Sequence, residues 1–218
     1  MKSVSYIFLL FMIYSFLGWL MEVLLKLIVE KKFINRGFFI GPYCPIYGTG
    51  VLLAIKLLTK FLDEPIVVFI LAMVICSLVE YYTSFILEKL FHTSWWDYSS
   101  KKYNINGRIC LEFMIPFGLG CLLVLYVINP FITNLLNQIP ENILNIIAIV
   151  LFIIFLIDVI VSLVLIIRFS KISVNAKEDN TEKVTAYVKN VIINKGKTLY
   201  TRFINAFPNM KVFKIKRK

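Results

Sequence analysis

The chain has 218 residues, of which 59% are hydrophobic and 17% are charged, and its mean hydropathy is +0.80. A soluble domain of this length cannot bury so much apolar surface, so the composition excludes a soluble globular protein and indicates an integral membrane protein. The net charge of +11 is uneven, because residues 168–218 hold 13 Lys plus Arg against 3 Asp plus Glu.

Apolar stretches predict an all-α membrane protein with about five transmembrane helices. They cover residues 4–28, 46–62, 66–87, 109–128 and 143–167, and the second is the shortest. We therefore expect a transmembrane domain over residues 1–167 and a basic cytoplasmic tail over residues 168–218. Lys and Arg gather in the first and third connections and in the tail, which predicts an outside N-terminus and a cytoplasmic C-terminus.

Glu22 is an ionisable residue inside the first span, about 9 Å past its middle at ~1.5 Å per residue. One interpretation is a ladder of i, i+4 pairs with Lys26 and Glu30 on one helix face. The other is a functional polar group, which is the default for an ionisable residue inside a membrane. We favour the functional interpretation, and we expect Gly18 to mark close helix packing.

The most unusual connection is F-I-N-R-G-F-F-I-G-P-Y-C-P-I-Y-G-T-G, residues 33–50. Its glycines and prolines prevent a regular helix from Gly41 to Pro45. Non-helical backbone near membrane depth is tolerated only where it is buried in protein or lines a wet cavity. We predict that this connection and part of the third one form the functional surface. The residues concerned are Gly41, Pro42, Tyr43, Cys44, Pro45, Tyr47, Trp96 and Asp97.

The first and third helices match at an offset of 58 residues, which aligns Glu22 with Glu80. At an offset of 70, Tyr47-Gly48-Thr49-Gly50 aligns with Phe117-Gly118-Leu119-Gly120. We infer two tandem helix-loop-helix repeats, about residues 4–62 and 66–128, followed by a fifth helix. Such repeats are related by a pseudo-twofold axis along the membrane normal.

This repeat predicts an intramembrane polar site in which Glu22 and Glu80 approach each other. Two facing carboxylates in a low dielectric do not both ionise easily, which suits a proton, a cation or a cationic group. Arg108 and Glu112, at positions i and i+4, pair either with each other or with this cluster. The predicted set is completed by Arg36, Asn35 and Asn106.

The W-W-D-Y-S motif at residues 95–99 has two compatible interpretations. Its aromatic residues, with Tyr103, anchor the third connection at the level of the lipid headgroups. Asp97 forms a bidentate pair with Arg36 or Arg108.

Three further features bear on binding. Asp158, near the middle of the last span, faces the bundle interior, faces a partner protein or is protonated. The four cysteines and the single histidine lack metal-ligand spacing, so we expect no metal and no cofactor. In the tail, basic residues alternate with apolar ones, which predicts a segment lying on anionic lipid and no nucleic-acid binding.

Four motifs in combination resemble a bacterial family of small membrane proteins, the type IV ABC-transporter permease-like family. They are Y-S-F-L-G-W-L-M-E (14–22), N-R-G-F-F-I-G-P-Y-C-P-I-Y-G-T-G (35–50), W-W-D-Y-S (95–99) and N-I-N-G-R-I-C-L-E (104–112). The resemblance covers about residues 5–165 and implies a multi-pass protein of the bacterial plasma membrane. It also implies an ATPase on a separate subunit, because this sequence has no complete Walker A motif.

We therefore expect a permease-like transport subunit whose polar site opens toward the cytoplasm. One alternative is a membrane-embedded enzyme or binding protein for a lipid or lipid-linked phosphate. In that case Glu22 or Glu80 is the general base, and Arg36 and Arg108 hold the phosphate. Another alternative is a regulatory or scaffolding membrane protein, and a homo-oligomer is compatible with all three.

Overall fold

The computed structural model describes residues 3–173, 180–194 and 198–213, which are predominantly helical. Four helices are long and apolar enough to cross a membrane. These are α1 (Val4–Glu30), α3 (Pro65–Phe91), the continuous stretch Leu111–Asn137, and α6 (Glu141–Ile172), whose apolar part is Glu141–Arg168. The prediction of a membrane protein built from helices is therefore confirmed, while the count of five spans is not.

The element that falls short is α2 (Pro45–Leu58), which has 14 residues and ends in the 3₁₀ turn Thr59–Phe61. At ~1.5 Å per residue α2 is about 21 Å long, less than a hydrocarbon core of about 30 Å. Its helix begins late because Pro45 stands at its first turn and the residues before it are non-helical. The connection that precedes α2 therefore has to cover the remaining part of the membrane thickness.

The fourth span is longer than predicted. It consists of α4 (Leu111–Leu123), a π-helical turn (Val124–Ile128) and α5 (Asn129–Asn137), where the sequence predicted a loop from Asn129. Pro130 removes one backbone donor, but the π turn lies directly before it, and such turns accommodate irregular hydrogen bonding within a helix. The helix therefore continues for nine residues beyond the predicted end.

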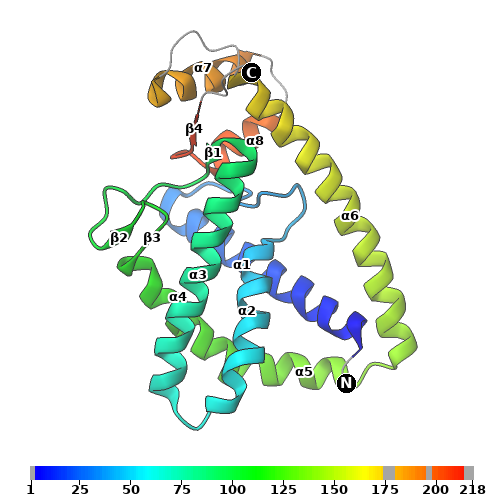
Figure 1. Cartoon of the computed structure of the whole chain (residues 1–218). Helices are drawn as coiled ribbons and strands as arrows, with labels where there is room; N and C mark the ends of the chain where they lie inside the picture. Colours follow the sequence, from blue (N-terminus) through cyan, green and yellow to red (C-terminus); the bar gives the residue numbers. More distant parts are fainter. Residues whose placement is uncertain (1–2, 174–179, 195–197, 214–218) are drawn as a thin grey trace.

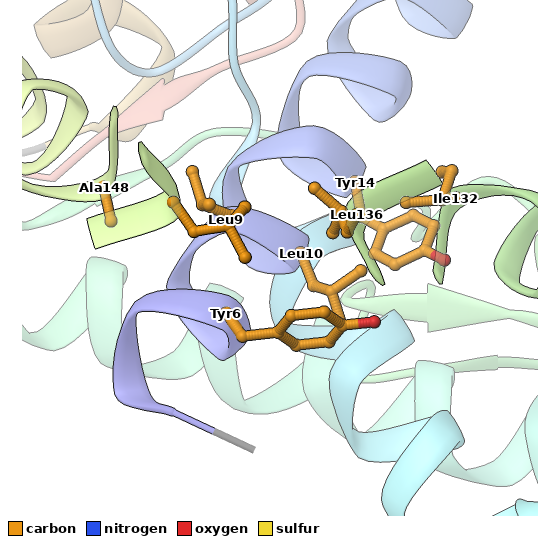
Figure 2. Packing of buried hydrophobic residues seen from close by; sticks show 8 residues of the cluster. Tyr6, Leu9, Leu10, Tyr14, Ile132, Leu136 and Ala148 are labelled. Carbon is orange, nitrogen blue, oxygen red and sulfur yellow. The ribbon is translucent and has the colours of Figure 1, made fainter. Parts of the chain in front are cut away.

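α1 is central to the transmembrane packing. It packs against α2, and its buried residues meet α5 and α6, as Figure 2 shows for Leu9, Leu10 and Tyr14 beside Ile132 and Leu136. A second core joins α2, α3 and α4 through small and branched side chains. Its buried members are Ala54, Leu58, Val68, Ala72, Cys121 and Leu125.

The remaining elements gather at one end of the molecule, which we call the loop end: residues 31–44, 92–110, 181–194 and 198–213 (Figure 1). It holds β1 (Thr93–Ser94), β2 (Asn104–Ile105), β3 (Ile109–Cys110), α7 (Thr181–Asn194), α8 (Thr198–Ala206) and β4 (Lys211–Val212). β2 and β3 form an antiparallel hairpin whose turn residues, Asn106 and Gly107, both have positive φ. That turn geometry explains the Asn-Gly pair in the sequence.

The C-terminal segment, residues 181–194 and 198–213, packs on the rest of the loop end. β4 pairs antiparallel with β1, with Thr93 opposite Val212. The apolar face of α7 is buried with β4, through Val184, Val188 and Ile192. These apolar residues pack on the protein, so they do not face lipid. Ile193 and Tyr187 of α7 stay exposed beside the basic residues. The contact of this segment with anionic lipid stays a prediction.

Candidate functional site

The connection between α1 and α2 descends into the transmembrane region. The backbone N–H of Cys44 donates to the Ser15 carbonyl of α1 (2.8 Å), and a side chain at Gly18 would overlap the ring of Tyr47. The start of α2 is therefore level with Ser15 and Gly18. From Gly18, α1 rises 12 residues to Glu30, about 18 Å at ~1.5 Å per residue, and residues 31–44 must return over this distance.

Asp158 of α6 holds the lowest part of this returning connection. Its carboxylate accepts from the backbone N–H groups of Ile40 (3.0 Å) and Gly41 (2.6 Å), and from the hydroxyls of Tyr43 and Ser162. Of the three environments considered for Asp158, the structure shows the bundle interior. Four donors to one carboxylate compensate for its burial.

Arg202 of α8 holds the same connection from the other side. Its guanidinium donates to the carbonyls of Gly37 (3.2 Å), Phe38 (3.3 Å) and Phe39 (2.6 Å). Burial lowers the pKa of Arg202, and the negative charge of Asp158 counteracts this. Arg202, from the C-terminal segment, is thus a positive charge that acts on Asp158. No basic residue lies near Asp158 in the sequence.

Asn35 completes the hydrogen bonding of this connection. Its Oδ1 accepts from Trp19 Nε1 (2.7 Å) and from the Gly37 N–H (3.3 Å), and its Nδ2 donates to the Ile40 carbonyl (3.1 Å). Non-helical backbone at membrane depth needs such internal partners. We call residues 35–44, with Asp158 and Arg202, the clamped loop.

The predicted motif residues of the clamped loop have distinct surroundings. A side chain at Gly41 would overlap the Tyr43 ring, Pro42 continues the turn, and Pro45 begins α2. Burial raises the pKa of the Cys44 thiol to about 12, and the Glu22 carboxylate adds to this effect. Cys44 therefore stays a neutral, packed thiol.

Glu22 and Tyr47 form the next layer, between α1 and α2. The Tyr47 hydroxyl donates to Glu22 Oε1 (2.5 Å), and Arg36 Nε donates to Glu22 Oε2 (3.3 Å). Lys26 pairs with Glu30 and not with Glu22, so the predicted ladder is present only in its upper half. Glu22 is thus turned toward the connection, as the functional interpretation requires.

Glu80 lies on α3 and is only 7% exposed. Its Oε1 accepts from the Tyr98 hydroxyl (3.3 Å), whereas Oε2 has no hydrogen-bond partner among the described residues. Burial raises the pKa of the Tyr98 hydroxyl, and the carboxylates of Glu80 and Glu22 raise it further. Both carboxylates therefore act on the same phenol, which stays protonated and able to donate.

Arg108 reaches α3 one to two turns above Glu80. Its Nη1 pairs with Glu88 (2.9 Å) and donates to Ser84 Oγ (3.1 Å). Of the two alternatives predicted for Arg108 and Glu112, the pairing with each other is wrong, because Glu112 pairs with Lys101 at the surface (2.9 Å). The structure does not bring Glu112 into the polar cluster.

Asp97 binds neither arginine, contrary to one sequence interpretation. It pairs with Lys211 of β4 (2.5 Å) and accepts from the backbone N–H of Ser99 (3.0 Å). Burial alone would raise the pKa of Asp97, but Lys211 and the two Ser99 donors lower it below its usual value. Asn106 also lies outside the cluster and donates to the Tyr81 hydroxyl (2.8 Å).

The aromatic residues of the third connection separate into inner and outer groups. Trp95 is 2% exposed and packs with Phe91, Ile166 and Phe203, so it belongs to a core of the loop end and not to a headgroup belt. Trp96 Nε1 donates to the Arg108 carbonyl (2.9 Å). Tyr103 is 78% exposed. Of the aromatic residues predicted to be anchors, it is the one whose side chain is free to reach the lipid headgroups.

Sequence reasoning missed Asp158, Arg202, Ser77 and Tyr98 as members of the site. Asp158 stood alone in an apolar run, and Arg202 is one of 13 basic residues near the C-terminus, so neither had a partner at a recognisable spacing. Ser77 did offer a signal, since it lies on the same face of α3 as Glu80, three residues before it.

A family model described as "Putative ABC-transporter type IV" matches residues 9–163 of the chain. The matched part includes the clamped loop, Glu22, Glu80 and Asp158, and it ends before Arg202 and the C-terminal segment. Searches of curated proteins and of solved structures found no match.

Proposed function

Since the chain belongs to the ABC-transporter type IV family, we propose that it is a permease-like membrane subunit with an intramembrane polar site. The site consists of Glu22, Tyr47 and Arg36 on one side and of Glu80 and Tyr98 on the other. It opens toward the loop end, where an ATPase on a separate subunit docks. We place that end in the cytoplasm, as the distribution of basic residues predicts.

The buried carboxyl group of Glu80 is the observation that carries this proposal. It is 7% exposed, and among the described residues it makes no ion pair. Placing an ionisable group inside a membrane is unfavourable, so such residues usually serve ion or substrate pathways. A scaffold protein would have no need of it.

Glycine packing supports the internal repeat that we propose for this site. A side chain at Gly48 would collide with Phe11 and Ser15 of α1, and one at Gly118 would collide with Phe69 (2.7 Å) and Met73 (2.6 Å) of α3. These contacts match the two sequence offsets, 70 for the glycines and 58 for their neighbours. Two alike helix pairs would place Glu22 and Glu80 at corresponding positions.

The lipid-phosphate alternative needs free arginines. In this structure Arg36 pairs with Glu22 and Arg108 with Glu88, so a phosphate would first have to break both pairs. Separating charge pairs of this kind costs free energy, which disfavours the alternative.

The decisive experiment is affinity purification from the native host in mild detergent, followed by mass spectrometry of the copurifying proteins. We expect stoichiometric recovery of an ATPase subunit. Its recovery should fall when the loop end is altered by Tyr103→Ala or Lys102→Glu, and should persist after Asp63→Asn at the opposite end. Recovery of the chain alone, with bound phospholipid or isoprenoid phosphate, would overturn the permease proposal.

A further inference from the structure

Glu80 has fewer hydrogen-bond and ion-pair partners than the other carboxylates of the polar region. Glu22 has Arg36 and Tyr47, Glu88 has Arg108, and Asp158 has four donors. Glu80 has one long hydrogen bond from Tyr98 (3.3 Å), and its Oε2 is unpartnered among the described residues.

Ser77 provides a second, independent sign of an incomplete site. Its hydroxyl is 3% exposed and has no hydrogen-bond partner among the described residues. Residues three apart on a helix share a face, so Ser77 Oγ lies one turn below Glu80 on the same side of α3. Buried polar groups are nearly always hydrogen-bonded, so two orphans on one face call for an explanation.

The two cations nearest to Glu80 are already paired with other carboxylates, Arg36 with Glu22 and Arg108 with Glu88. Glu80 interacts electrostatically with Glu22 of α1 and with Tyr47 of α2. Tyr98, which donates to Glu80, also interacts electrostatically with Cys110. From α4, the uncharged Phe113 stacks on Tyr98 (ring centroids 4.8 Å apart). On α3 itself the neighbouring groups are Cys76 and Ser84, the latter already engaged by Arg108.

We infer that Glu80 is a proton-binding site, and that the ion handled by the proposed polar site is a proton. The Oε2 lone pair forms an O–H bond with a proton delivered by a hydronium ion at the loop end. The hydronium ion leaves as water, and the side chain passes from charge −1 to neutral. The neutral side chain then no longer needs the counter-charge that the described residues do not supply. This inference rests on the polar site of the proposed function.

A proton fits better than a metal cation. Cations such as Mg²⁺ or Ca²⁺ take about six or more oxygen ligands. Among the described residues, no three His, Cys, Asp or Glu side chains gather where they could hold a metal ion. Neutralising a buried carboxyl group by a proton needs no further ligands, and it is the usual response to burial without a counter-ion.

The test is infrared difference spectroscopy of the full-length protein in lipid nanodiscs, titrated from acidic to alkaline pH. We expect the band of a protonated, buried carboxylic acid at neutral pH, and we expect this band to disappear as the pH rises. Glu80→Gln should abolish this band. Glu112→Gln should leave it unchanged, because Glu112 is exposed and paired with Lys101. Circular dichroism and gel filtration show that each variant is folded.

A second variant tests the neighbouring charge. Glu22→Gln removes a negative charge and leaves Arg36 unpaired, so the loss of the band should move to lower pH. A neutral-pH spectrum without a protonated carboxyl, or a band that survives Glu80→Gln, would overturn the inference. Because the isolated protein is measured, this outcome is independent of whether an ATPase copurifies.

Discussion

At the scale of single residues, the site is built from side chains that complete the bonding of non-helical backbone. Asp158 accepts two N–H groups of the clamped loop, and Arg202 donates to three of its carbonyls. Glycines contribute by what they lack, since Gly18 lets the Tyr47 ring lie against the α1 backbone. Tyr47 can reach Glu22 because of this close approach.

Replacing Gly18 with alanine should destabilise the protein. The added Cβ would overlap the Tyr47 ring, and overpacking of this kind typically costs about 1–3 kcal/mol. Thermal unfolding in detergent should show a lower midpoint. Gly120→Ala is the matched control, because nothing lies within 4 Å of a Cβ at that helical position. Equal midpoints for the two variants would contradict the packing described here.

Asp158→Asn should loosen the clamped loop. An amide keeps the shape of the side chain but turns a donor toward the N–H groups of Ile40 and Gly41, and lost hydrogen bonds to a charged group cost about 1.5–3 kcal/mol each. We expect a lower unfolding midpoint and faster proteolysis within residues 35–44. Asp63→Asn, at an exposed position between α2 and α3, should change neither quantity.

At the scale of elements, the clamped loop lies deep in the bundle because α2 is short. Because α2 begins level with Gly18, the chain between α1 and α2 must lie inside the transmembrane region, where its polar backbone needs partners. α6 provides them from within the membrane and α8 from the loop end. The C-terminal segment is thus part of the folded unit, although the sequence alone suggested a peripheral tail.

Arg202→Met should uncouple α8 from the clamped loop. Three backbone carbonyls lose their donor, so hydrogen–deuterium exchange should become faster in peptides covering residues 37–43. Arg168→Met is the control, since Arg168 is exposed on α6 and its loss removes the same charge. Unchanged exchange in the Arg202 variant would mean that α8 does not hold the loop.

At the scale of the whole molecule, both connections that carry the site and the C-terminal segment lie at one end (Figure 1). The link between α2 and α3 and the helix α5 lie at the other end. In this arrangement α2 runs toward the other end of the bundle, and we propose that it crosses the membrane even though it is short. The arrangement also agrees with the predicted placement of basic loops on one side of the membrane.

Cysteines introduced at Lys32, Asp63 and Tyr103 should report this topology. A membrane-impermeant maleimide should label the first and third from one side of the membrane and the second only from the other. The unmodified chain is the control for background labelling, because Cys44, Cys110 and Cys121 are buried but Cys76 on α3 is only half-buried. Labelling of Lys32→Cys and Asp63→Cys from the same side would show that α2 does not cross.

Composition and hydrophobic pattern were enough to predict a helical membrane protein, four of its spans and the irregular backbone around Gly41, whereas the polar role of Glu22 and Glu80 stays a prediction. These are local properties, set by segment length, by proline and glycine, and by the cost of a carboxylate among apolar neighbours. Only tertiary structure decided that Asp158 and Arg202, 44 residues apart, clamp the first connection, and that Glu112 and Asp97 face elsewhere. Such pairings depend on how helices pack and where a chain folds back, and no spacing in the sequence encodes them.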